Sequence, residues 1–152
     1  MGRAGGADQD RRADRLPRDV GDGAITALLT KGHTKGSTTF VTNVVDAGNV
    51  YTVVLPNALS INPGYRVAKE PSYFGIGDNF RRTLRVLEML KPDIWLAPHT
   101  ETYDFQGEPA RSAQEGVRAW VDPEGYRLWL VAQRENFEAT VNEELGLKAK
   151  PK

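Results

Sequence analysis

The sequence predicts an α/β domain, with strands in its first half and helices in its second. Segments typical of strands, in which apolar residues run or alternate, cover residues 24–31, 39–46 and 49–55. Beyond residue 78, apolar side chains recur at helical spacing in two long segments. With 152 residues, 39% of them apolar, the chain is long enough for one domain with a modest core.

The composition argues against several classes of protein. Positive and negative side chains balance to a formal net charge of zero, and a nucleic-acid binder would show a basic patch or a strongly basic domain. There is no cysteine, so neither disulfides nor thiolate metal sites are expected. No stretch is long and apolar enough to span a membrane.

Both ends of the chain differ in composition from the middle. Residues 1–21 are dense in both charge signs and nearly free of large apolar groups, which predicts a disordered or ill-matched leader. This segment also lacks the apolar core of a secretory signal. Residues 148–152 are expected to be a frayed tail, which leaves residues 22–147 as the folded domain.

Between the first two strands lies Gly32-His33-Thr34-Lys35-Gly36, a turn that begins with a histidine. The two glycines allow a sharp bend that holds the imidazole at a strand end, a position that suits a metal ligand. The second histidine of the chain, His99, follows a short apolar run at 94–97, which predicts a buried strand. An isolated histidine is more often structural than a ligand, so the residues alone leave both readings open.

The remaining elements follow from local signals. Asp46-Ala-Gly-Asn49 predicts a hairpin turn, with positive φ expected at Gly48 and Asn49. The proline- and glycine-rich stretch 56–77 predicts a long loop, either functional or simply covering. The predicted helices cover 79–90, capped by Asp78 and ended by Pro92, then 110–120, then Asp122 to Leu145 with Gly146 as its stop. The buried stripe of the last helix is expected at Tyr126, Leu130, Phe137 and Val141.

Several of these segments resemble one known family. The run Gly32-His33-Thr34-Lys35-Gly36-Ser37-Thr38 looks like the third metal-binding motif of the metallo-β-lactamase superfamily, and most closely that of the third subclass of class B (zinc) β-lactamases. Other segments that fit this subclass are Leu55–Ser60, Asn62-Pro63-Gly64-Tyr65, Pro71–Gly75, Asp78–Leu84 and Asp93–His99.

The resemblance runs from about residue 22 to about residue 146 and covers only the C-terminal half of the family pattern. It implies half of a four-layer αβ/βα sandwich, a mostly antiparallel sheet with helices on one face. In a whole family member, the sheet of the other half would cover the opposite face. The first metal motif, His-x-His-x-Asp-His, is absent, because His33 and His99 are the only histidines. The missing N-terminal half is therefore expected to be needed for a complete site.

By resemblance, the family's function is zinc-dependent hydrolysis of β-lactam antibiotics, and hence antibiotic resistance. Two zinc ions share a hydroxide that attacks the lactam carbonyl. His33 would ligate the first ion and His99 the second. Ser60 matches a serine that holds the substrate's carboxylate, although a loop-capping role is nearly as good a reading, and Asn57 is a candidate polar wall.

Three functional hypotheses remain open. The first is a β-lactam hydrolase, represented by a truncated chain that is inactive alone. The second is another hydrolase of the superfamily, a lactonase or a thioesterase. The third is a non-catalytic remnant or interaction module, which the missing first motif favours. Family members are periplasmic or secreted, but without a signal peptide this chain would be cytoplasmic if expressed as given.

Overall fold

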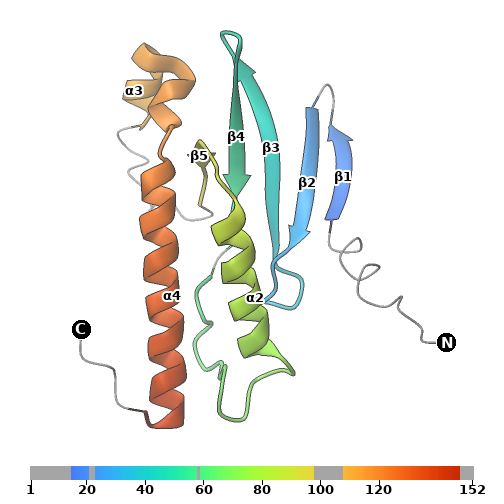
Figure 1. The fold of residues 1–152 in the computed structure, drawn as a ribbon, viewed down its shortest axis with the longest axis vertical. Coiled ribbons are helices and arrows are strands. Elements are labelled where there is room, and N and C mark those ends of the chain that lie inside the picture. The colour runs from blue at the N-terminus through green and yellow to red at the C-terminus, as the bar shows by residue number, and fades with distance from the viewer. Residues whose placement is uncertain (1–14, 21–22, 58, 98–107, 148–152) are drawn as a thin grey trace, which may run out of the picture.

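Five strands form one sheet in the computed structural model, which describes residues 15–20, 23–57, 59–97 and 108–147. The spatial order of the strands is their order in the chain (Figure 1). The first four strands pair antiparallel, and the fifth joins the fourth in parallel. The strands are β1 (Arg15–Val20), β2 (Gly23–Leu29), β3 (Thr38–Asp46), β4 (Asn49–Leu55) and β5 (Ile94–Trp95).

The hairpin between β3 and β4 is confirmed with its turn over residues 46–49 as predicted, but the residues at positive φ come one position earlier than expected. Asp46 pairs with Asn49, which leaves a two-residue loop. Ala47 has φ 48° and Gly48 has φ 79°, so positive φ falls at this pair and not at Asn49. Two-residue loops with both central residues at positive φ match the right-handed twist of the flanking strands.

Helix α2 (Ile76–Met89) connects β4 to β5 and starts earlier than the sequence predicts. Asp78 lies in its first turn, while the residue before the helix is Gly75, in the left-handed conformation at φ 77°. Gly77, which the sequence predicts in the long loop, lies in the first turn of this helix. An added Cβ would lie 2.6 Å from the carbonyl oxygen of Val67, so the glycine allows a close approach of backbone to helix.

The helix predicted over 110–120 is divided in two. Helix α3 covers Glu108–Glu115, and a 3-10 helix, η2, covers Gly116–Trp120, with Gly116 at φ 62°. Helix α4 (Pro123–Leu145) has the predicted ends: the Asp122 side chain accepts a hydrogen bond from the Gly125 N–H, and Gly146 adopts φ 65°.

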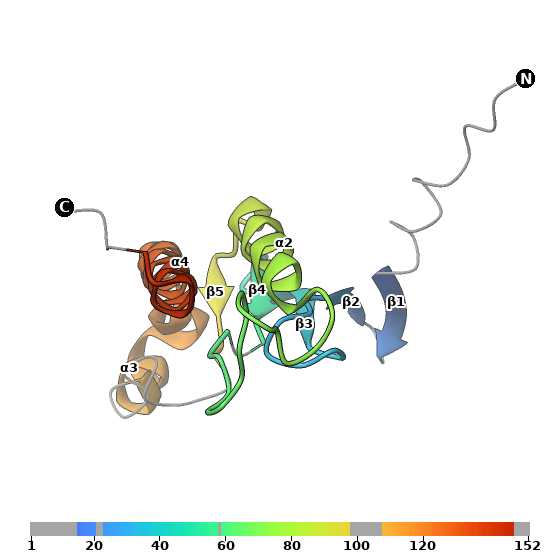
Figure 2. The same cartoon turned by 90° about the horizontal axis from the view of Figure 1, so that it is seen from below.

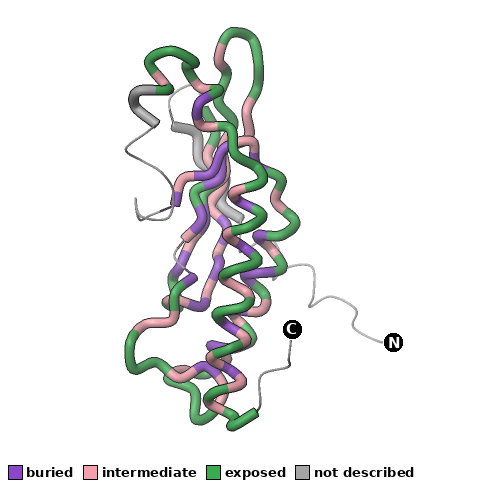
Figure 3. Tube along the Cα trace, turned by 90° about the vertical axis from the view of Figure 1, so that its left-hand side faces the viewer, coloured by how far each residue is buried: buried purple, intermediate pink, exposed green. Residues whose placement is uncertain are grey.

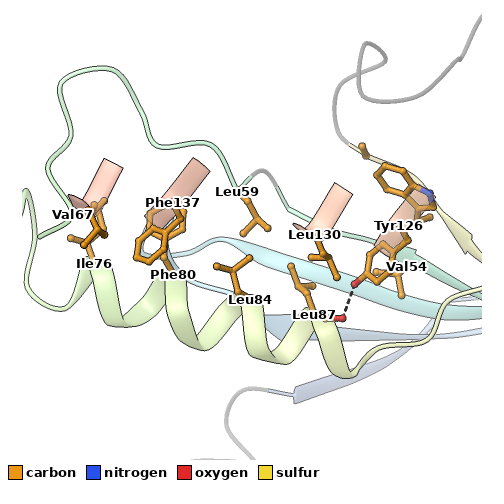
Figure 4. Packing of buried hydrophobic residues seen from close by; sticks show 13 residues of the cluster. Val54, Leu59, Val67, Ile76, Phe80, Leu84, Leu87, Tyr126, Leu130 and Phe137 are labelled. Carbon is orange, nitrogen blue, oxygen red and sulfur yellow. Dashed lines mark hydrogen bonds between the residues drawn. The ribbon is translucent and has the colours of Figure 1, made fainter. Parts of the chain in front are cut away.

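Helices α2 and α4 lie side by side and cover one face of the sheet (Figure 2). Buried and exposed residues alternate along both helices, as expected when one side packs inward (Figure 3). Phe80 of α2 stacks on Phe137 of α4, with ring centroids 5.3 Å apart (Figure 4). The fold class is therefore confirmed, as is the buried stripe of α4, made of Tyr126, Leu130, Phe137 and Val141.

The opposite sheet face carries exposed apolar side chains near its centre. Val54 and Thr39 point to the helices and are fully buried. Because side chains alternate along a strand, their neighbours Leu55 and Phe40 point the other way, and these are 37% and 43% exposed. Val44, two pleats along β3 from Phe40, is also exposed.

Strand β1 falls within the leader for which the sequence predicts disorder. Its backbone pairs with β2 from Arg15 opposite Leu28 to Val20 opposite Gly23. Backbone pairing needs no apolar side chain, which is why a segment poor in apolar residues can add to a sheet edge. The rest of the leader, the tail 148–152 and His99 lie outside the described residues.

Candidate functional site

The histidine turn closes on itself through backbone and hydroxyl groups. The Thr30 N–H donates to the Ser37 carbonyl at 2.8 Å, which joins the two ends of the loop between β2 and β3. Inside the loop, the Thr34 N–H donates to Ser37 Oγ at 2.9 Å. The buried Ser37 hydroxyl therefore fixes the residue that follows His33.

His33 faces the long loop that follows β4. Its Nδ1 lies 2.6 Å from the main-chain oxygen of Ser60 and 3.4 Å from the Ser60 hydroxyl. A carbonyl oxygen can only accept, so Nδ1 must carry the proton and donate it. Nε2 of the neutral ring then keeps its lone pair. A ring held in this way, with a carbonyl behind it, is the usual arrangement of a metal-ligating histidine.

Three consecutive carbonyls of the turn accept hydrogen bonds from three different side chains. Thr83 Oγ1 donates to the Lys31 carbonyl at 2.6 Å. The Tyr73 hydroxyl donates to the Gly32 carbonyl at 2.6 Å. The carbonyl of the histidine itself accepts from Asn62 Nδ2 at 3.2 Å. The donors come from α2 and from the long loop, so both elements hold the turn in place.

Asn57 lies at the base of the same turn. Its side-chain Nδ2 donates to the Thr30 carbonyl, and its backbone N–H donates to Thr39 Oγ1, both at 3.4 Å. The hydroxyls of Thr30 and Thr39 share a buried hydrogen bond of 2.9 Å. Asn57 therefore supports the turn. With its bond to Thr30, the carbonyls of all four residues from 30 to 33 accept a hydrogen bond from a side chain.

Gly32 is packed against the core of the domain. It is buried, has φ 150°, and an added Cβ would lie 3.0 Å from Cδ1 and Cγ of Phe80. The Phe80 ring is 1% exposed and already stacked on Phe137. The residue before the histidine therefore has no room for a side chain, and the turn sits directly on α2.

The far end of the long loop is tied to the last turn of α4. The Glu144 carboxylate accepts hydrogen bonds from the backbone N–H groups of Val67, Ala68 and Lys69 at 2.7–2.9 Å. Burial raises the pKa of this carboxyl, but the three backbone donors, helped by Arg66, outweigh it and hold the pKa below its usual range.

The structure brings together two of the predicted site residues, His33 and Ser60, and puts Asn57 beneath them. His99 lies outside the described residues. Within the part of the chain that is described, no group of three or more His, Cys, Asp or Glu side chains is placed to hold a metal ion. Nor does any helix there have the length and apolar character to cross a membrane.

Sequence reasoning missed the side chains that hold the turn. Tyr73 and Thr83 are 41 and 52 residues from their acceptors, and Glu144 is more than 70 residues from its donors. The burial of the Tyr73 hydroxyl, which raises its pKa and keeps it a donor, follows from packing and not from local sequence. Of the residues that hold the turn, Asn62 lies in the segment Asn62–Tyr65 that carries part of the family resemblance, but no role was predicted for it.

No protein-family model matches the chain. Solved structures do. The native metallo-β-lactamase of Legionella gormanii superposes with a TM-score of 0.80 and 26% identity, over 87% of this chain and 50% of the other. A β-lactamase from Chitinophaga pinensis gives a TM-score of 0.72 and 28% identity, over 85% and 49%. A class B3 di-zinc metallo-β-lactamase from an Alaskan soil metagenome gives 0.75 and 26%, over 85% and 49%.

The chain thus spans about half the length of each of these enzymes. The match covers more than four-fifths of this chain. Further neighbours described as subclass B3 enzymes, at 24% and 21% identity, share the same half-length fold. The chain has the fold of one half of a subclass B3 metallo-β-lactamase and resembles that subclass in a way consistent with its C-terminal half.

Proposed function

We propose that this chain forms one side of the zinc site of a β-lactam hydrolase, with His33 as a ligand of the first ion and His99 as a ligand of the second. The observation that carries the proposal is the Nδ1–H donation from His33 to the Ser60 carbonyl. It leaves Nε2 as the free nitrogen of a half-buried, well-anchored ring. The likeness to a di-zinc class B3 enzyme supports the choice of metal.

The donor set fits zinc in kind but is incomplete in number. Neutral imidazole nitrogen is a common zinc ligand, and a main-chain carbonyl behind the ring is a common supporting partner. A catalytic zinc ion generally has three protein ligands. His33 supplies one, and among the described residues no group of three or more His, Cys, Asp or Glu side chains is placed to complete a site. The remaining ligands are therefore expected from His99 and from a complementary half that carries His-x-His-x-Asp-His.

Bound zinc would supply Lewis acidity and lower the pKa of water at the site. The residues of this chain would bind and orient. The Ser60 hydroxyl is exposed beside His33, where it could donate to the carboxylate of a β-lactam. Asn57 directs its amide N–H to Thr30, so its main contribution is to hold the turn, with a wall for substrate as a second role.

Two other functions remain as alternatives. A lactonase or thioesterase would use the same histidines with a different substrate pocket. A non-catalytic remnant would keep the fold without the chemistry. The β-lactamase reading is preferred, because the neighbours with at least 25% identity are all described as β-lactamases.

The experiment joins an N-terminal half carrying His-x-His-x-Asp-His, from a subclass B3 enzyme, upstream of residue 22. The fusion is assayed with zinc against a chromogenic cephalosporin, a lactone and a thioester. We expect zinc-dependent hydrolysis of the cephalosporin, lost in His33→Ala and in His99→Ala. Hydrolysis of only the lactone or the thioester would replace the β-lactamase assignment. A folded fusion that binds two zinc ions and turns over none of the three would favour the remnant.

The chain without a fused half is the matched control. It should not hydrolyse the cephalosporin, because binding without a positioned attacking group gives no turnover. If it does so at a zinc-dependent rate that His33→Ala abolishes, the half-site proposal is wrong.

A further inference from the structure

We propose that Tyr73 is a positioning residue that sets the orientation and tautomer of the His33 ring. A single side chain contacts the turn on both sides of the histidine. The Tyr73 hydroxyl donates to the Gly32 carbonyl at 2.6 Å. Nζ of Lys35 lies over the Tyr73 ring, 5.4 Å from its centroid, within the range of a cation–π contact.

Tyr73 is itself well held. Its carbonyl accepts from the Ile76 N–H at the start of α2, at 3.3 Å. Its ring meets that of Tyr65 edge-on, with centroids 6.5 Å apart. The preceding residue, Ser72, makes two hydrogen bonds to the backbone of Arg66. Its N–H donates to the Arg66 carbonyl at 2.9 Å, and its Oγ accepts from the Arg66 N–H at 2.8 Å. These contacts hold the phenol side chain of Tyr73 in one position.

The contact matters because Gly32 is the residue whose backbone sets the direction of His33. Removing the Tyr73 hydroxyl would leave the Gly32 carbonyl without this hydrogen-bond donor. Because Gly32 is buried, the loss would carry a free-energy penalty. A glycine also rotates more freely than other residues once its peptide is released. That rotation would move the imidazole away from the Ser60 carbonyl, which lies only 2.6 Å from Nδ1.

The tautomer reports this geometry directly. In water, neutral imidazole populates mainly the Nε2–H form. The bond to Ser60 instead holds the proton on Nδ1 of His33. Loosening the turn should therefore return the ring toward its solution preference. The same change would take the free lone pair away from Nε2, the nitrogen that the proposed function assigns to zinc.

The test measures the tautomer of His33 by 15N NMR in the full chain, free of metal and at a pH where the histidines are neutral. His99→Gln assigns the signals. We expect the Nδ1–H form in the unsubstituted chain and a clear shift toward Nε2–H in Tyr73→Phe, which keeps the ring over Lys35. Tyr51→Phe removes the same hydroxyl from β4 and should leave the tautomer unchanged.

An unchanged Nδ1–H form in Tyr73→Phe would overturn the proposal, as would an equal shift in Tyr51→Phe. Tyr73→Leu removes the ring as well and should shift the tautomer at least as far. If that variant does not fold, Tyr73→Phe alone decides. The role of the ring toward zinc rests on the proposed function. Because the measurement needs neither zinc nor substrate, failure of the proposed function would leave its result intact.

Discussion

Phe40 of β3 and Leu55 of β4 are direct cross-strand partners, and both are exposed on the sheet face that the helices do not cover. Cross-strand pairs of this kind normally stabilise a sheet by packing together and against a second layer. Here no second layer covers this pair among the described residues, although Val53, the nearest residue of β4 on the same face, is buried. Contiguous exposed apolar surface of this sort marks an interaction surface or an aggregation hazard.

We expect the chain to be marginally stable and to self-associate through this face. Each large apolar side chain left uncovered forgoes about 1.5–3 kcal/mol, while a whole domain is stable by only about 5–15 kcal/mol. Phe40→Thr with Leu55→Thr should reduce association in sedimentation velocity at little cost in stability, because both side chains are already partly exposed. The control is Val45→Thr, near the hairpin turn, where the residue is 71% exposed. It should change neither the association nor the stability. A monodisperse monomer with a sharp two-state thermal transition would contradict this expectation.

Gly32→Ala should destabilise the domain by about 1–3 kcal/mol, the usual range for overpacking a core. The new Cβ would lie 3.0 Å from the Phe80 ring, which is stacked on Phe137, and Gly32 has φ 150°, a backbone conformation that L side chains rarely adopt. Gly36→Ala is the matched control in the same turn, since a Cβ there meets nothing within 4 Å. Urea unfolding measures both. Equal losses would show that neither the contact of Gly32 with α2 nor its backbone conformation accounts for the effect.

Glu144→Gln should cost about 1.5–3 kcal/mol at neutral pH, because a charged acceptor of backbone N–H groups is replaced by a neutral one. The folded pKa of Glu144 lies below its unfolded value. The stabilisation is therefore complete above the pKa of the unfolded chain and is lost as pH falls through the lower pKa of the folded protein. The difference between the two proteins should shrink toward zero in acid.

The control for this pH dependence is Glu143→Gln, at the exposed neighbouring residue. It should leave the free energy of unfolding nearly unchanged across the same pH range. If both variants lose the same amount at neutral pH, the bonds from Glu144 to the loop contribute no more than a general charge effect at the end of α4.

The chain as it stands should bind zinc weakly. Metal affinity grows with the number of assembled ligands, and each ion would find one histidine here. Zinc content after dialysis should be well below one ion per chain, and His33→Ala and His99→Ala should each lower the residual binding. Stoichiometric zinc that survives dialysis and is lost in either variant would mean that the chain assembles a site of its own.

The elements predicted correctly carry their signals within a few residues. Asp122 followed by Pro123 starts α4, and Gly146 ends it, because caps act on the nearest turn. The start of α2 was missed because Gly75 and Gly77 look like loop residues. One is the left-handed residue before the helix, and the other makes room for the carbonyl of Val67. Sequence alone does not distinguish these uses of glycine.

The candidate site was predictable in its chemistry but not in its construction. His33 stood out because glycines flank it, and Ser60 through its family context. The hydrogen bonds that orient the ring come from residues such as Tyr73 and Thr83, brought near only by the path of the long loop and the packing of α2. Contacts of this separation leave no periodic trace in a sequence.

The strand order of the sheet has a consequence for synthesis. Each strand from β1 to β5 is hydrogen-bonded to the one made just before it, and none pairs across a strand that comes later. Such an arrangement keeps contacting segments close along the chain, which favours fast folding. The sheet can therefore grow strand by strand as the polypeptide leaves the ribosome, with α2 closing over β4 before β5 emerges. The packing of α4 on α2, and the bonds from Glu144 to the loop, can form only once this last helix has been made.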